Sequence, residues 1–141
     1  MKNLATCTPH EFVKQTNLIK HSVEKWLKET EILKIRKTLP ELIPITLDMD
    51  EKDVKKAAKE NDERRRAQVY ANASKMFDAA MADHPDETVE LLALLCFVEP
   101  EDVDNHTMDE YLSCISDMIL CESVVGFFTS LKKSGLMNIL G

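Results

Sequence analysis

The chain has 141 residues, of which 44% are apolar and 30% charged, with only 3 glycines and 5 prolines. This composition excludes wholesale disorder and favours a helical domain, and the longest apolar run falls short of the roughly 18 residues of a membrane span. The net charge of −7 is unevenly distributed. Residues 1–75 carry 16 basic and 12 acidic side chains, whereas residues 76–141 carry 2 basic and 13 acidic ones. An uneven distribution of charge along a chain bears on which partners the protein binds and how it assembles, and says little about its fold.

The first predicted element is an amphipathic helix within an N-terminal segment, residues 1–39. Thr8 and Glu11 form a capping box at its start. A shorter apolar pattern after Thr30 predicts one or two further turns, which end before Pro40 because the residue ahead of a proline resists the helical conformation. Apolar side chains recur in the first helix at steps of seven, four and three residues and form one stripe: Phe12, Ile19, Val23 and Trp26.

A linker and a long helix are predicted next. Residues 40–50 contain two prolines among apolar residues, which predicts an extended linker or a strap over a groove. Asp50 can cap a helix that runs to about Asp83. Residues 51–66 are nearly all charged, so we expect this half to be solvated. The second half has an apolar stripe with the spacing of core residues: Val69, Tyr70, Ala73, Met76, Phe77, Ala80 and Met81.

Three further helices are predicted from Pro85 onward. The range Val89–Val98 is apolar on nearly every side, which predicts a central helix wrapped by the others. Thr107 and Glu110 form a second capping box ahead of the next helix. The last helix ends near Gly135, which suits a left-handed cap.

These elements predict an all-α fold of about six helices. We expect a compact C-terminal helical bundle, a long central helix and an amphipathic N-terminal helix. Along the chain, residues 1–39 are the amphipathic segment, residues 40–50 the linker, and residues 51–141 the long helix with the bundle. All three parts are expected to form one structural domain.

The sequence shows no recognisable catalytic motif, such as a phosphate-binding loop or a nucleophile elbow. His84 and His106 lie beside acids but precede helix starts, where capping explains them better. Cys7 and His10 have a metal-like spacing without a matching second pair. Acids interleave the basic run around Arg64–Arg66, as on a solvated helix face. We therefore expect no enzyme, cofactor or metal, and neither nucleic acid nor membrane as a partner.

Four stretches carry a resemblance: residues 1–26, 83–102, 108–112 and 126–131. They resemble small proteins encoded in the tail modules of phages and prophages of Gram-positive bacteria, which are similar to the tail assembly chaperones of long-tailed phages. The resemblance does not extend to residues 40–75. It implies a non-enzymatic protein of the bacterial host cytoplasm that binds apolar helical segments of the tape-measure protein. The complex would stay soluble until tail-tube subunits polymerise.

Two functional hypotheses therefore compete. In the first, apolar helix faces bind the client, and the candidate partner-binding residues are Phe12, Ile19, Val23, Trp26, Phe127 and Phe128. In the second, the acidic half imitates nucleic acid and blocks a basic host protein. However, the acids cluster at helix starts and in the turn 99–104, where caps favour them anyway. The division of charge also leaves self-association open.

Overall fold

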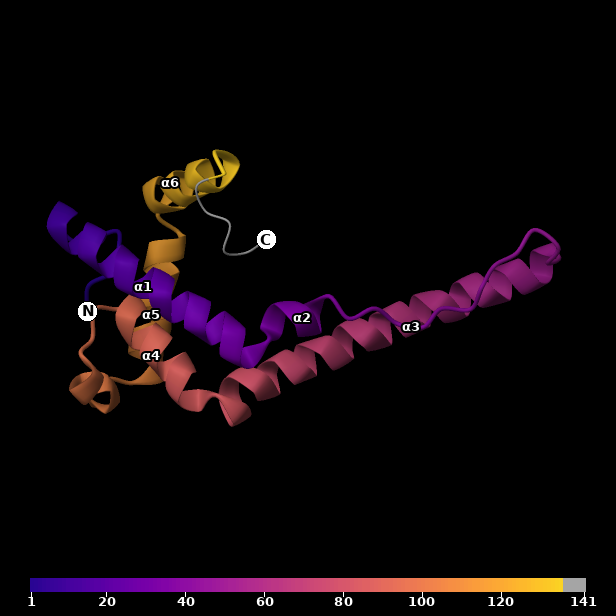
Figure 1. Ribbon diagram of the computed structural model, residues 1–141, viewed down its shortest axis with the longest axis horizontal. Helices are drawn as coiled ribbons and strands as arrows, with labels where there is room; N and C mark the ends of the chain where they lie inside the picture. The colour runs from indigo at the N-terminus through magenta and orange to yellow at the C-terminus, as the bar shows by residue number, and fades with distance from the viewer. Residues whose placement is uncertain (136–141) are drawn as a thin grey trace. The chain divides into compact units, whose positions relative to one another are not determined.

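The computed structural model describes residues 1–135, and the short apolar tail, whose place the sequence leaves open, lies outside the described residues (Figure 1). The structure is 75% helical and has no strand within residues 1–135, which confirms the all-α class. The elements in chain order are α1 (Pro9–Thr30), α2 (Ile32–Arg36), α3 (Glu51–Asp78), the π-helical turn η1 (Ala79–Asp83), α4 (Pro85–Leu95), the 3-10 helix η2 (Pro100–Asn105), α5 (Met108–Ile119) and α6 (Glu122–Lys133).

The chain divides into two units that do not follow its linear order. Unit 1 comprises Met1–Trp26 and the chain from Pro85 onward, and unit 2 comprises Leu27–His84. The long helix is thus grouped with the linker before it, whereas the sequence grouped it with the C-terminal helices. Unit 1 has 6 basic and 13 acidic side chains, and unit 2 has 12 of each. The whole net charge of −7 therefore belongs to unit 1.

The core of unit 1 is small. Cys96 is fully buried and packs with Tyr111 and Cys114 of α5, and burial raises the pKa of the Cys96 thiol to about 12. The Tyr111 hydroxyl donates to the carbonyl oxygen of Val103 at 2.8 Å. Within α4 only Ala93 is buried, so the expectation of a fully wrapped helix is wrong. One side of α4 stays open where it lines the groove described below.

The helix ends behave as the sequence predicts. Thr8 accepts from the Glu11 backbone nitrogen at 3.3 Å, and Asp50 accepts from Asp53 at 2.8 Å. Thr107 and Glu110 form a reciprocal capping box at the start of α5. Gly135 has a φ of +78° after α6, as a left-handed cap requires. The local sequence is sufficient to predict these helix ends because each cap uses groups within about one helical turn.

Unit 2 is held by polar side chains of α3. Residues 37–50 form an extended strap that runs alongside α3 in the opposite direction (Figure 1). Asn61 donates to the Ile43 carbonyl oxygen at 3.0 Å and accepts from the Ile43 nitrogen at 2.8 Å. Asn72 donates to the carbonyl oxygen of Thr38 at 3.0 Å, and Arg64 to that of Glu41 at 2.8 Å. The strap has neither helix nor strand, and hydrogen bonds between α3 side chains and its main chain fasten it to α3.

The predicted burial of the apolar stripe on α3 and η1 is wrong for five of its members. Tyr70 is 80% exposed and Phe77 63%, and Val69, Ala73 and Met81 are also exposed. Asn61 and Asn72 are eleven residues apart, about three helical turns, so they share a face. The strap's unpaired backbone groups bind to that polar face, because their burial requires hydrogen bonds. The opposite, apolar face is left uncovered.

The start of α1 predicts a pH dependence. The pKa of Glu11 is lowered from 4.5 to about 2, first by a hydrogen bond from Lys2 Nζ at 2.9 Å and then by one from Thr8. Because the folded pKa lies below the unfolded one, the stabilisation is complete above the unfolded value of 4.5 and is lost as the pH falls toward 2. We expect Lys2→Met to raise the Glu11 pKa measured by carboxyl NMR titration. Lys20→Met is the control, and an unshifted Glu11 titration in Lys2→Met would contradict the assignment.

Candidate partner-binding site

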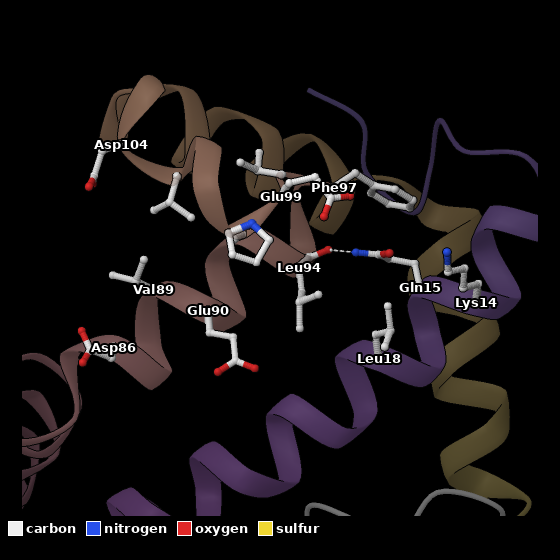
Figure 2. Close-up of a pocket in the computed structure, with 14 residues that line it drawn as sticks. Lys14, Gln15, Leu18, Asp86, Val89, Glu90, Leu94, Phe97, Glu99 and Asp104 are labelled. Atoms are coloured by element: carbon white, nitrogen blue, oxygen red, sulfur yellow. Dashed lines mark hydrogen bonds between the residues drawn. The ribbon is translucent and has the colours of Figure 1, made fainter.

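An open groove of about 770 Å³ lies between α1 and α4 in unit 1 (Figure 2). Its walls come from α1, from α4, and from the turn and 3-10 helix that follow α4. Slightly more than half of its lining is apolar and includes the side chains of Leu18, Val89, Leu94, Phe97, Val98 and Val103. Leu18 is 41% exposed and Val89 40%, so these side chains are accessible from solvent. The groove thus offers apolar surface that the fold itself leaves uncovered.

Polar contacts at two positions along α1 hold this helix alongside α4. Gln15 donates from Nε2 to the Leu94 carbonyl oxygen at 2.6 Å, which satisfies a backbone acceptor in the last turn of α4 (Figure 2). Farther along α1, the Trp26 indole nitrogen donates to the Thr88 hydroxyl at 2.9 Å. Because residue 15 meets residue 94 and residue 26 meets residue 88, the two helices run antiparallel. The groove opens beside these contacts.

Phe97 lines the groove in a backbone conformation that normally belongs to glycine. Its φ is +55°, and it lies two residues after the end of α4. The Val98 nitrogen donates to the Ala93 carbonyl oxygen at 2.9 Å, which is the closing bond of a Schellman cap. A left-handed residue with a side chain costs roughly 1–2 kcal/mol relative to the right-handed conformation. Strain of this kind gathers at functional sites, and here it places an aromatic ring on the groove wall.

The rim of the groove is acidic. Asp86, Glu90, Glu99 and Asp104 line it, and Lys14 is its one basic residue. Lys25 pairs with Glu90 at 3.4 Å across the exposed edge. Carboxylates around an apolar surface favour a ligand that has apolar anchors flanked by basic groups. Within residues 1–135, no cluster of three histidine, cysteine, aspartate or glutamate side chains is arranged to hold a metal ion.

The six residues predicted as partner contacts lie outside this groove. The ring of Phe12 is 5.6 Å from that of Phe127 and 6.3 Å from that of Phe128, so these three form an aromatic cluster between α1 and α6. Ile19, Val23 and Trp26 are half-buried along α1. Their substitution would therefore disturb the packing of unit 1 before it reported on a partner.

The residues that line the groove are hard to identify from the sequence alone. Leu18 lies off the apolar stripe of the first helix, and Phe97 belongs to the apolar run Val89–Val98, which predicts a wrapped central helix. In an uninterrupted apolar run, no polar side distinguishes the exposed residues from the buried ones.

Comparisons with protein-family models, curated proteins and solved structures find no match for this chain. Within the described residues no single helix is long and apolar enough to cross a membrane, and only α5 and α6 together, bent by 66°, reach that length and composition.

Proposed function

We propose that this protein is a non-enzymatic binding protein that holds an amphipathic helix of a partner in the groove between α1 and α4. The observation that carries the proposal is the accessible apolar groove with an acidic rim, in a unit whose net charge is −7. A partner helix can bury side chains at spacings of three, four and seven residues in such a groove. Basic residues at the edge of the partner's apolar face would meet the rim.

The role that fits this binding mode is assembly chaperoning in the bacterial cytoplasm. The resemblance to small tail-module proteins names the client class as the tape-measure protein, a long chain with apolar helical segments. Covering those segments removes apolar surface from water, and the acidic exterior of unit 1 would keep the complex soluble. Release would follow when tail-tube subunits compete for the same apolar helices.

Salt dependence tests this function against the acidic-mimic alternative. We expect a tape-measure protein encoded beside this gene to become soluble on co-expression and to co-purify with the chain. Retention should persist when salt is raised to about 1 M, where the Debye length is only about 3 Å, because apolar contacts are insensitive to screening. Loss of the complex between low and physiological salt would instead support an acidic inhibitor of a basic protein. A client that stays insoluble on co-expression would contradict the chaperone role.

A further inference from the structure

The groove between α1 and α4 favours a ligand with apolar anchors and a basic flank, and unit 1 itself contains such a segment. Residues 136–141, which lie outside the described residues, have the sequence Leu-Met-Asn-Ile-Leu-Gly and carry no charged side chain. Lys132 and Lys133 precede them, and these two are the only lysines or arginines after residue 75. We call residues 132–141 the basic-apolar tail. Its composition matches the ligand class that the acidic rim selects.

The rim offers a carboxylate to the basic flank of the tail. Glu99 lies at the end of the groove where Gln15 binds the Leu94 carbonyl oxygen (Figure 2). Within residues 1–135 Glu99 forms no ion pair, so its charge is open to a cation. Lys132 and Lys133 are exposed in the last turn of α6. The two lysines can therefore pair with the rim without breaking an existing ion pair.

The tail begins within reach of this end of the groove. Phe128 of α6 stacks on Phe12 of α1, with ring centroids 6.3 Å apart. Gln15 follows Phe12 by about 5 Å along α1, and Lys133 follows Phe128 by about 8 Å along α6. An extended chain as long as the part of the tail after Lys133 spans up to roughly 26–29 Å. That length is sufficient for the tail to enter the groove from the Gln15 end.

We propose that the basic-apolar tail binds in the groove as an internal competitor of the client. Its apolar residues Leu136, Ile139 and Leu140 pack on the apolar lining, and its lysines lie at the Glu99 end. The inference rests on the proposed function, because it assigns a regulation to the same site. Tail and client bury the same apolar surface, so they exclude each other. The tail covers the groove in the absence of a client, and the client must displace it.

The short connection to α6 allows a weak contact to be effective. A segment joined by a few residues has an effective concentration of roughly 1 mM at its site. A few partly buried apolar side chains give an intrinsic dissociation constant of roughly 0.1 mM. The tail then occupies the groove in roughly nine of ten molecules, and the apparent affinity for the client falls roughly tenfold. Such a competitor is strong enough to exclude weak ligands and weak enough for a tight client to displace.

Methyl NMR of the full chain tests tail binding without any client. In the double variant Leu136→Asp with Leu140→Asp, the methyl signals of Leu18 and Val89 should shift from their wild-type positions because the tail leaves the groove. A synthetic peptide with the sequence of the tail, added to this variant at millimolar concentration, should move the signals back. Leu120→Asp is the matched control, since Leu120 is 75% exposed in unit 1 and does not line the groove. It should leave both signals in place.

Titration with peptides covering the apolar helices of the tape-measure protein tests the competition. Leu136→Asp with Leu140→Asp should bind these peptides roughly tenfold more tightly than the wild type, and Leu120→Asp should bind them like the wild type. Groove signals that stay unchanged in the tail variant would overturn tail binding, whether or not a client binds. Equal client affinities of the wild type and the tail variant would overturn the competition. A client that binds neither protein, while the tail peptide still moves the groove signals, would contradict the proposed function and not tail binding.

Discussion

Replacing Leu18 and Val89 together by aspartate is expected to weaken client binding by about 100-fold or more while leaving the fold intact. Both side chains line the groove and are about two-fifths exposed, so the free protein accommodates the new charges in water. Full burial of an apolar side chain of this size is worth about 1.5–3 kcal/mol, so the two-fifths still exposed in the free protein contributes roughly 1 kcal/mol at each position. Burying two unpaired carboxylates against an apolar partner costs at least a few kcal/mol more, and the sum exceeds the roughly 2.8 kcal/mol of a 100-fold change. Isothermal titration with peptides covering the apolar helices of the tape-measure protein measures the effect.

Val13→Asp is the matched control for this experiment. Val13 lies on the same helix as Leu18 and is 71% exposed, but it does not line the groove. We expect Val13→Asp to bind the client like the wild type. Equal losses in Val13→Asp and Leu18→Asp would show that charge on α1 matters generally and that the groove is not the site.

Phe97→Gly separates binding from stability at the same site. Glycine relieves the positive φ of residue 97 and keeps the cap of α4, so backbone strain is removed while the ring leaves the groove wall. We expect client affinity to fall with little loss in the free energy of unfolding. A variant that binds normally would show that the strained ring serves only packing within unit 1.

Replacing Asn61 by alanine is expected to have the largest effect on unit 2. Asn61 is nearly fully buried, and its amide both donates to and accepts from Ile43. Two lost hydrogen bonds at about 1 kcal/mol each, with a buried backbone donor and acceptor left unpaired, predict a loss of about 2–4 kcal/mol in unfolding free energy. Chemical denaturation measures this loss, and the Ile43 amide should exchange its hydrogen faster because the strap detaches.

Asn61→Asp is the informative comparison. A carboxylate keeps an acceptor for the Ile43 nitrogen but cannot donate to the Ile43 carbonyl oxygen, so we expect partial protection of that amide and an intermediate stability. Gln68→Ala removes another side-chain amide of the same helix, which donates to the Asn72 side chain at 2.7 Å rather than to the strap, and should change Ile43 exchange little. Unchanged exchange in Asn61→Ala would mean that the strap is held by its other contacts.

Local features of the fold were predictable from sequence because their causes are local. The capping boxes at Thr8 and Thr107, the Asp50 cap and the left-handed Gly135 each involve groups within about one turn, and the structure contains all four. The extended strap was likewise indicated by its prolines. The candidate contact residues were harder to predict from the sequence, because an apolar stripe on a helix is equally consistent with burial in the protein's own core and with burial in a complex. Phe12 lies in an aromatic cluster of the chain itself, whereas Leu18, off the stripe, lines the groove.

The helical class, the helix ends and the total charge follow from the amino-acid sequence alone. Which helix faces are covered, and how the charge is shared between the two units, depends on long-range contacts. On α3 the strap covers the side bearing Asn61 and Asn72, because buried backbone groups require hydrogen-bond partners and side-chain amides supply them. The apolar side with Tyr70 and Phe77 consequently stays exposed. The first helix joins the acidic helices that follow Pro85, so the charge division between the halves of the chain becomes one unit at −7 and one neutral unit. Periodicity shows that a helix has an apolar side, and long-range contacts decide what that side meets.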